Sequence, residues 1–333
     1  MRKSIAIAIT ESSQMGEARR VALHLATRFG FKEVERGRVG IVVTEVASNL
    51  LQHAQGGVIV LRAIQEPTIG IEVLALDKGS GMIDVDQCLQ DGFSTAGTAG
   101  NGLGAVRRLS DLFEIYSTPG SGTAILAQLW SEPLSQPPKI LLEIGAVCLP
   151  KRGEEVSGDA WANQIEPHRS VLLMADGLGH GCAAANASSA AVRMLEENYQ
   201  RSPHEIVEAA HQALRSTRGA VLAIAEINFD QQSVRYAGIG NIATSISSFT
   251  EHYNLVSHNG TVGHEVRKIQ EFAHPWYPNG LLIMHSDGLG TQWRLDRYPG
   301  LRQKHPSLIA GVLYRDFNRD RDDVTVLVAR EAR

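Results

Sequence analysis

The order of apolar and polar residues predicts two successive layered domains. In the first part of the chain, apolar residues at helical spacing alternate with short strand-like runs. The predicted helices are 16–29, 33–53 and 103–113. The predicted strands are 4–10, 58–64, 69–76, 113–118 and 123–130. Helices paired with strands in this order favour an α+β fold in which helices pack on an antiparallel sheet.

A proline-rich stretch separates this pattern from a second one. The segment SEPLSQPPK at 131–139 holds three prolines and few apolar residues, so we assign 1–131 to a first domain, 132–139 to a linker and 140–333 to a second domain. The predicted strands there are 141–149, 170–176, 220–229, 233–240, 243–249, 281–287 and 324–330. The predicted helices are 183–199, 203–217 and 307–317. This pattern again indicates an α+β layered domain.

Charge and composition narrow the function classes. The 333 residues carry a formal net charge of −4, so no basic field favours nucleic acid or an anionic membrane. No apolar run approaches the roughly 18 residues that a membrane span needs. Cys88, Cys148 and Cys182 form no CxxC pair, and we expect buried thiols in a reducing cytoplasm rather than disulfides or a zinc site.

Acidic residues in the second domain stand at strand ends. The tetrapeptide DGLG follows an apolar run twice, at 176–179 and 287–290, and further carboxylates occur at Asp159 and in the pair 322–323. Hard divalent cations such as Mg²⁺ and Mn²⁺ take oxygen ligands of this kind. A single Asp-Gly after a strand is also an ordinary turn signal. The repeated arrangement is what favours a shared metal site.

These motifs, in this order, resemble the PPM-type metal-dependent protein phosphatases in their small bacterial SpoIIE/RsbX branch, over roughly 139–330. The motifs AGIGN at 237–241 and NGTVG at 259–263 add to the likeness. The resemblance implies an αββα sandwich and metal-assisted attack of water on phosphoserine or phosphothreonine without a phosphoenzyme. It also implies a metal set comprising the carboxylates of Asp159, Asp176, Asp287 and Asp322 and the carbonyl of Gly177. The first three would be catalytic, and Asp323 is the weaker match of its pair.

Other polar residues of this half have alternative interpretations. His180 could protonate the leaving alcohol or cap the helix that follows it. Five further histidines, including His285, keep no ligand spacing and are expected in loops or at the surface. No arginine matches the residue with which larger phosphatases of this type hold phosphate, so substrate binding stays open.

The first domain contains a second group of polar and glycine-rich motifs. Glu45 and Asn49 lie four residues apart and therefore project from one face of the predicted helix, either as a functional pair or as an exposed polar stripe. Asp77 follows a strand in the run DKGSG, and the glycine-rich segment GTAGNGLGA leads into a helix. Such backbone before a helix N-terminus can surround a phosphate. The run lacks GxxxxGK[ST], so it is not a P-loop.

ExxxN, DxGxG and GNGLGA together resemble the boxes of the GHKL ATPase/kinase superfamily over about 1–130, most closely the RsbT-type serine kinases and next the RsbW-type anti-sigma-factor kinases. The resemblance implies that Asp77 binds the adenine amino group of ATP, Asn49 holds Mg²⁺ and Glu45 is the general base. The glycines that would shape the pocket are Gly79, Gly81, Gly100, Gly102 and Gly104. A histidine kinase is disfavoured, because only about 30 residues precede the Glu45 helix.

A serine kinase joined to a phosphoserine phosphatase predicts a partner-switching regulator that acts in both directions on one STAS-domain protein. The alternative keeps the phosphatase and makes the first domain a module that only binds nucleotide or sequesters a STAS or sigma-factor partner. Domains of the GHKL type often have exposed sheet edges that contact partners, so a homodimer is also possible.

Overall fold

The chain forms two compact units that do not coincide with two continuous stretches of sequence. The computed structural model describes residues 3–66, 68–90, 102–132 and 141–332. One unit, here the N-terminal unit, comprises Lys3–Lys139 together with Arg294–Arg315. The other, the C-terminal unit, comprises Met1–Arg2, Ile140–Trp293 and Asp316–Arg333. A segment late in the sequence thus belongs to the first unit.

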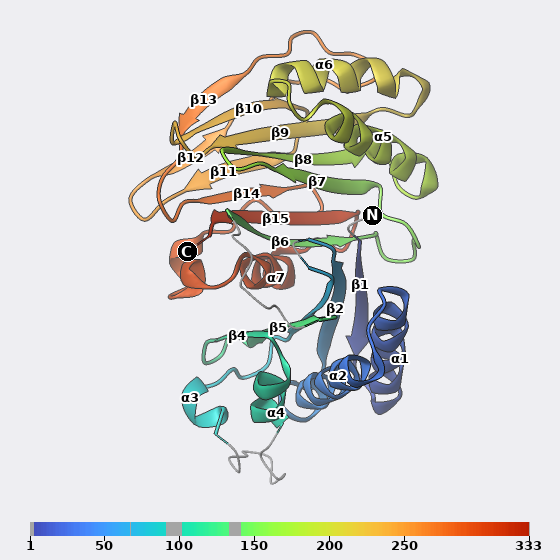
Figure 1. The fold of residues 1–333 in the computed structure, drawn as a ribbon, viewed down its shortest axis with the longest axis vertical. Coiled ribbons are helices and arrows are strands. Elements are labelled where there is room, and N and C mark those ends of the chain that lie inside the picture. Colours follow the sequence, from blue (N-terminus) through green and yellow to red (C-terminus); the bar gives the residue numbers. More distant parts are fainter. Residues whose placement is uncertain (1–2, 67, 91–101, 133–140, 333) are drawn as a thin grey trace. The chain divides into compact units, whose positions relative to one another are not determined.

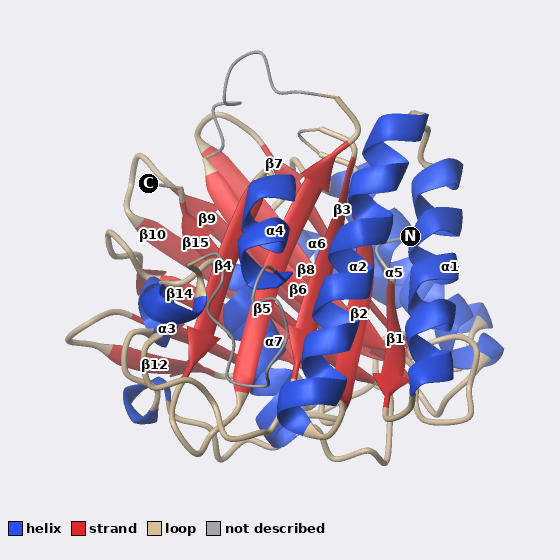
Figure 2. Ribbon diagram, turned by 90° about the horizontal axis from the view of Figure 1, so that it is seen from below, coloured by secondary structure: helices blue, strands red, loops and turns tan. Residues whose placement is uncertain are grey.

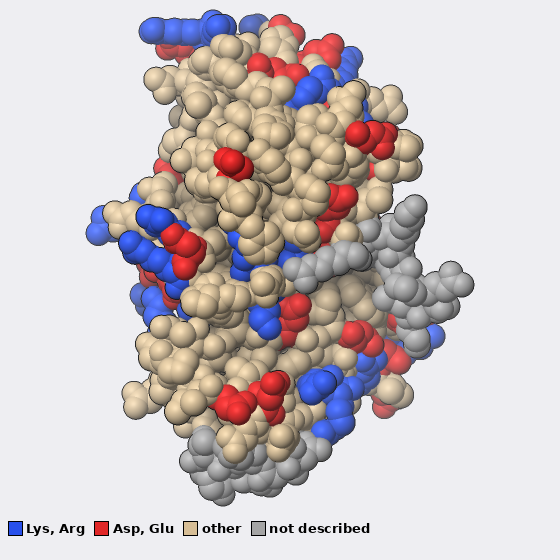
Figure 3. Space-filling model, turned by 90° about the vertical axis from the view of Figure 1, so that its left-hand side faces the viewer, with Lys and Arg blue, Asp and Glu red and all other residues tan. Residues whose placement is uncertain are grey.

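Within the described ranges, no helix combines the length and apolar character that crossing a bilayer requires. Acidic and basic side chains are interspersed on the face shown in Figure 3. This mixture agrees with the small net charge of the sequence.

In the N-terminal unit, helices α1, α2 and α4 cover one face of a five-stranded sheet (Figures 1 and 2). Its five antiparallel strands lie in the order β1-β2-β3-β5-β4. The strands are β1 Ser4–Ile9, β2 Gly57–Ile64, β3 Gly70–Leu76, β4 Leu112–Ser117 and β5 Thr123–Trp130. The helices are α1 Ser12–Arg28, α2 Glu33–Ala54, the short α3 Val85–Cys88 and α4 Gly102–Leu109. The predicted helix-on-sheet domain is confirmed.

One boundary in this unit was wrong. The sequence predicted a helix to residue 113, whereas α4 ends at Leu109 and β4 begins at Leu112. The Arg38 guanidinium accounts for the stop, because it donates to the Leu109 carbonyl at 2.7 Å and to Asp111 at 3.0 Å. These bonds satisfy a terminal carbonyl that continued helix would otherwise have used.

The sheet has two buried faces of different character. On the helix side, alternate apolar residues such as Ile59, Ile71 and Ile125 pack against α1, α2 and α4. On the opposite side, Arg62, Glu72 and Gln128 form a row across three neighbouring strands. The Glu72 carboxylate accepts hydrogen bonds from Arg62 Nε at 2.9 Å, from Gln128 Nε2 at 2.7 Å and from Ser307 Oγ at 2.6 Å. Every polar atom of the carboxylate is therefore paired.

Glu72→Gln is expected to destabilise the protein by about 3–5 kcal/mol, because the buried Arg62 would lose its ion pair with Glu72. Burial alone would raise the pKa of Glu72, but the Arg62 charge and the Ser307 and Gln128 hydrogen bonds lower it below 4.5. A lowered folded-state pKa means that this stabilisation is present above pH 4.5 and is lost as the pH falls further.

Denaturant unfolding of parent and variant at pH 7 and pH 3 measures both effects. The difference between the two proteins should shrink at the lower pH. Glu17→Gln, which removes an exposed carboxylate on α1, is the control and should change stability by less than about 0.5 kcal/mol. Equal stability of Glu72→Gln and parent at pH 7 would contradict the account of a paired buried carboxylate.

The C-terminal unit contains two five-stranded sheets, β13-β10-β9-β8-β7 and β12-β11-β14-β15-β6. Helices α5 Cys182–Asn198 and α6 Pro203–Ala213 pack on the first sheet (Figure 1). The strands of the first sheet are β7 Asp159–Ile165, β8 Arg169–Gly177, β9 Ala220–Asn228, β10 Ser233–Ile239 and β13 Phe272–Pro275. Those of the second are β6 Leu142–Leu149, β11 Ala243–Ser247, β12 His252–Leu255, β14 Leu281–His285 and β15 Val324–Glu331.

The predicted α+β class with two domains is confirmed, with differences in detail. Strands β7, β12 and β13 were not predicted, because their polar residues break the alternation that marks a strand. Helix α7, Pro306–Phe317, is close to its predicted bounds. Residues 306–315 of α7 belong to the N-terminal unit, whereas the sequence assigned all of 140–333 to the second domain.

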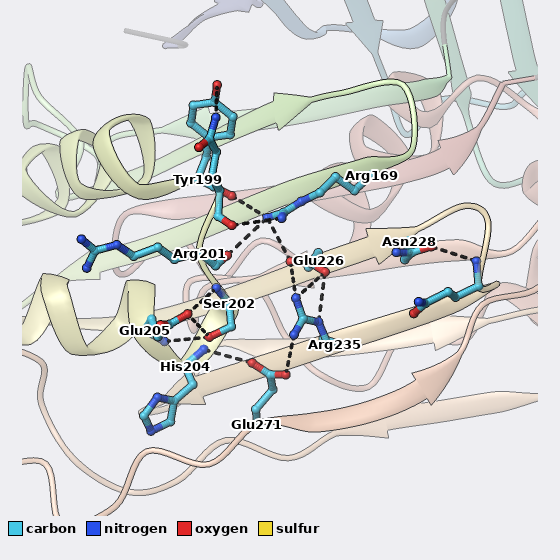
Figure 4. Close-up of polar contacts among 12 residues, drawn as sticks. Arg169, Tyr199, Arg201, Ser202, His204, Glu205, Glu226, Asn228, Arg235 and Glu271 are labelled. Carbon is cyan, nitrogen blue, oxygen red and sulfur yellow. Dashed lines mark hydrogen bonds and ion pairs between the residues drawn. The ribbon is translucent and has the colours of Figure 1, made fainter.

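A charged network holds the connection between α5 and α6 against the first sheet (Figure 4). Arg169 donates to the Tyr199 carbonyl at the end of α5 and pairs with the buried Glu226 at 3.0 Å. Arg235 also pairs with Glu226, at 2.7 Å, and reaches Glu271 at 3.4 Å. With the hydrogen bond from the His204 N–H to Glu271 at 3.2 Å, these contacts fix the end of α5 and the start of α6 against the sheet.

Candidate functional site

Two of the predicted metal carboxylates stand opposite each other on neighbouring strands. Asp159 begins β7 and Asp176 is near the end of β8, and the two are register partners in the antiparallel pair. Side chains of directly opposed residues lie on the same face of a sheet, with Cβ atoms about 5 Å apart. The sheet register therefore brings together two acids that are 17 positions apart in the sequence.

The second sheet adds its acids to the same place through hydrogen bonds. Ser286 Oγ, next to Asp287, donates to Asp159 Oδ2 at 2.6 Å. The Gly158 N–H donates to Asp323 Oδ2 at 2.9 Å. A Cβ on Gly288 would lie 2.1 Å from the Asp323 carbonyl oxygen, so only glycine permits this approach. Both DGLG loops are thus tied to one group of carboxylates.

The electrostatics of this group favour a cation. Burial, followed by the charges of Asp159, Asp287, Asp322 and Asp323, raises the pKa of Asp176 to about 9. Burial also raises the pKa of Asp159 to about 7, although the hydrogen bond from Ser286 opposes the shift. Such shifts arise where carboxylates are buried close together without a positive charge.

The donor set suits a hard divalent ion. Asp159 Oδ1 is buried and has no hydrogen-bond partner among the described residues, which leaves it available to a cation. In the described ranges, no three His, Cys, Asp or Glu side chains are already arranged so that they could hold an ion. The side chains would therefore have to turn toward the ion to bind it.

The two acids of the 322–323 pair differ in their surroundings. Asp323 is buried, and its two oxygens accept hydrogen bonds from the backbone of Lys151 at 2.8 Å and of Gly158 at 2.9 Å. Asp322 is exposed, and the one hydrogen bond that it accepts among the described residues comes from the Asp323 N–H, at 2.9 Å. This contrast supports Asp322 as the ligand of the pair and gives Asp323 a structural role.

Several residues near these acids were missed or placed wrongly by sequence reasoning. Asn241, in the AGIGN motif, donates to Asp287 Oδ2 at 2.9 Å. The N-cap of α5 is Gly181, so His180 does not cap this helix; its Nδ1 lies 2.6 Å from Glu154 Oε1. His285 was expected in a loop or at the surface but ends β14 with 2% exposure. Cys182 was expected to be buried and is exposed.

Arg218, which sequence reasoning did not single out, lies beside the first DGLG loop. The backbone N–H of Leu178 donates to the Gly219 carbonyl at 3.0 Å, which fixes the Arg218 turn against the loop. Arg218 Nη1 lies 3.2 Å from the position of a Cβ on Gly179. Among the described residues this exposed guanidinium makes no hydrogen bond or ion pair, so it can meet an anion at the rim of the carboxylate group.

The N-terminal unit brings the predicted polar pair of α2 next to α4. A Cβ on Gly102, the first residue of α4, would lie 2.9 Å from Glu45 Oε2 and 3.6 Å from Asn49 Oδ1. Asn49 Nδ2 is buried and has no partner among the described residues. The pair therefore faces the start of α4 instead of forming an exposed stripe, and it has bonding capacity left for a ligand.

Asp77, directly after β3, uses one carboxylate oxygen in hydrogen bonds to the backbone and leaves the other for a ligand. Its Oδ1 accepts hydrogen bonds from Gly79 N at 2.8 Å and Thr123 N at 3.1 Å. Its Oδ2 makes none among the described residues. Burial raises the pKa of Asp77 above 3.8, opposed by these backbone hydrogen bonds. A fixed, half-buried carboxylate of this kind can accept a hydrogen bond from an amino group.

The glycines predicted for this site have different outcomes. Gly79 and Gly81 follow Asp77, and Gly81 adopts a φ of +68° with no room for a Cβ beside the Thr118 carbonyl. Gly102 and Gly104 lie in α4, where Gly104 is buried. Gly100 lies outside the described residues.

Comparison with known proteins connects each unit to a family. Residues 9–129 match the histidine kinase-like ATPase domain, and residues 166–331 match stage II sporulation protein E (SpoIIE). The phosphoserine phosphatase RsbX of Bacillus subtilis (strain 168) is 32% identical over 145 residues, which are 43% of this chain and 72% of RsbX. The serine/threonine-protein kinase RsbT of the same organism is 35% identical over 114 residues, 34% of this chain and 86% of RsbT.

The chain belongs to both families. It is a fusion of a histidine kinase-like ATPase domain and a SpoIIE domain. A chain from a solved structure of the bacterial stressosome, described as a modular system adapted to control secondary messenger signaling, is also similar. That likeness has a TM-score of 0.54 and 27% identity and covers 57% of this chain and 99% of the other. In this ATPase–SpoIIE fusion, the Glu45–Asn49 and Asp77 groups lie in the ATPase domain and the carboxylate group lies in the SpoIIE domain.

Proposed function

We propose that this chain phosphorylates and dephosphorylates the same serine or threonine of a STAS-domain protein, as a cytoplasmic partner-switching regulator. The observation that supports it most directly is the placement of Glu45 and Asn49 beside Gly102, because a base beside the phosphate-binding segment suits phosphoryl transfer more than binding alone. The relatives RsbT and RsbX are a kinase and a phosphoserine phosphatase by name. A single chain with both sites could set the phosphorylation state of one partner.

In the ATPase domain, Asp77 Oδ2 would accept a hydrogen bond from the adenine amino group. The side chain of Asn49 would help to hold Mg²⁺. Glu45 would take the proton of the attacking hydroxyl. Gly102 would let the phosphates approach the start of α4, whose N–H groups favour anions. Positioning and charge neutralisation are the main requirements of phosphoryl transfer, and these residues supply the positioning.

In the SpoIIE domain, Asp159, Asp176, Asp287 and Asp322, with the Gly177 carbonyl, would hold Mg²⁺ or Mn²⁺. The bound ions would supply a Lewis acid and an activated water. Asn241 and Ser286 would keep Asp287 and Asp159 oriented, since each donates a hydrogen bond to one of these carboxylates. Arg218 would bind the phosphoryl oxygens of the substrate.

The experiment is a phosphorylation time course of the cognate STAS-domain protein with Mg-ATP. With Asp176→Asn, which lacks phosphatase activity, nearly all of the STAS-domain protein should become phosphorylated. With the parent, the phosphorylated fraction should reach a lower steady level. Adding parent without ATP to the phosphoprotein should release phosphate. Mg²⁺ and Mn²⁺ are compared in parallel.

The alternative, a nucleotide-binding or sequestering N-terminal domain, predicts a different result. It expects Asp176→Asn to bind ATP, or the STAS protein, without any phosphate transfer. No transfer combined with intact phosphatase activity in the parent would therefore favour the alternative over the paired-enzyme proposal.

A further inference from the structure

The Asp77 backbone is held by an arginine from the far end of the sequence. Arg315 Nη1 donates to the Asp77 carbonyl oxygen at 3.1 Å. On its other side this carbonyl meets Gly122, where a Cβ would lie 2.1 Å away. Asp77 N donates to the Thr123 carbonyl at 2.9 Å. Arg315 therefore completes the set of contacts that fixes the residue proposed to bind adenine.

Arg315 belongs to a segment that is built into the N-terminal unit. The side of the sheet opposite α1 and α2 receives residues of 294–315 at four separate points. Ser307 Oγ donates to Glu72 at 2.6 Å, and the His305 N–H donates to Glu114 at 2.7 Å. The Tyr298 ring lies 6.5 Å from that of Tyr116.

The fourth point is an apolar contact at the centre of α7. A Cβ on Gly311 would lie 3.2 Å from Leu76 and 3.4 Å from Leu74, so the helix backbone approaches the sheet closely. The α7 residues from Pro306 to Leu313 are buried. A helix with this much buried surface moves as one body with the strands that it contacts.

The residues that follow Arg315 hold the second DGLG loop of the C-terminal unit. The Gly290 N–H donates to the Phe317 carbonyl at 2.8 Å, and the Arg319 N–H donates to the Gly288 carbonyl at 3.0 Å. Arg319 Nη1 donates to the Asp287 carbonyl at 3.2 Å. Only three residues of continuous chain, 316–318, thus lie between the residue that contacts Asp77 and the residue that contacts Asp287.

We propose that Arg315 is a positioning residue of the nucleotide site, and that α7 links nucleotide binding to the Asp287 loop of the phosphatase. The proposal rests on the nucleotide site of the proposed function. Nucleotide bound at Asp77 would favour the conformation in which Arg315 contacts the Asp77 carbonyl. Because residues 316–319 follow directly, this conformation would also influence the contacts of Phe317 and Arg319 with residues 287–290. By reciprocity, divalent ion at the carboxylates would change nucleotide affinity by the same factor.

The first test measures Mg-ADP binding to the full chain by calorimetry. Arg315→Gln should weaken binding about fivefold to tenfold, because the Asp77 carbonyl loses its donor and the carboxylate its fixed position. Arg297→Gln, an exposed arginine of the same segment, should bind like the parent. Unfolding midpoints of both variants show whether the loss is local. Equal affinity of Arg315→Gln and parent would overturn the positioning role.

The second test follows the Asp287 loop directly by hydrogen exchange. In the parent, saturating Mg-ADP should change the hydrogen-exchange rates of the Gly288 and Gly290 amides. It should also change the Mg²⁺ affinity of the carboxylate group at least fivefold. Both responses should be lost in Arg315→Gln at ADP concentrations that saturate it, and kept in Arg297→Gln.

The outcomes separate the two proposals. A parent that binds no nucleotide would refute the nucleotide site itself. A parent that binds Mg-ADP without any response at 288–290 or in Mg²⁺ affinity would refute the link through α7 and leave the nucleotide site standing. A response retained in saturated Arg315→Gln would also refute the link through this arginine.

Discussion

Asp176→Asn is expected to remove the phosphatase activity and at the same time to stabilise the metal-free protein. Loss of a ligand that helps to activate the water should lower the rate by about a hundredfold or more, since metal assistance is worth several kcal/mol. In the absence of metal, however, Asp176 is a buried carboxylate among other carboxylates, and their repulsion opposes folding. A neutral amide of the same shape removes that repulsion.

The raised pKa of Asp176 determines how the stability of the metal-free protein changes with pH. The pKa of Asp176 is raised from 3.8 to about 9, so the folded protein holds a proton that the unfolded chain releases. The stabilisation from this proton is complete below pH 3.8 and is lost as the pH rises toward 9. Metal-free parent should therefore lose stability across this range, and Asp176→Asn should lose less. At pH 8 the variant should melt a few degrees higher.

Thermal unfolding with EDTA and hydrolysis of p-nitrophenyl phosphate with Mg²⁺ or Mn²⁺ measure the two effects. Asp230→Asn is the matched control, because this exposed acid follows the opposite end of β9 and should change neither quantity. If Asp176→Asn were less stable than parent without metal, the carboxylates would not repel one another as described. If it kept full activity, Asp176 would not be a ligand.

The sequence predicted the parts of the fold that depend on local pattern. Helices α1, α2 and α5 appear within four residues of their expected bounds, because the apolar spacing that predicts them acts over one or two turns. The acids at the strand ends could be named for the same reason: an Asp-Gly that closes an apolar run is a local signal. What each acid touches was not predictable from such signals.

Long-range contacts set the limits of sequence reasoning. Asp322 and Asp323 are adjacent and chemically identical, and only the backbone donors Lys151 and Gly158 distinguish the buried acid from the exposed one. Arg218 is near the carboxylates because β9 pairs with β8, which its own sequence context does not reveal. In the same way, the pattern at 306–317 predicts a helix but not the sheet that covers it.

Glu45→Gln is expected to abolish phosphate transfer to the STAS-domain protein while leaving nucleotide binding intact. Removal of a general base lowers a transfer rate by about a hundredfold to ten-thousandfold. Glutamine keeps the shape of the side chain and therefore its packing against Gly102, where Glu45 Oε2 would lie 2.9 Å from a Cβ. The variant is made in the Asp176→Asn background, so that any phosphoprotein formed is not hydrolysed.

Phosphoprotein formed per minute and the Mg-ADP dissociation constant are measured on the same preparation, with Glu33→Gln, an exposed acid in the first turn of α2, as the control. Transfer near the parental rate would exclude Glu45 as the base. Loss of both transfer and nucleotide binding would instead assign it a structural role in the pocket. Loss of transfer with binding unchanged is the result that separates a kinase from a nucleotide sensor, because a sensor has no proton to remove.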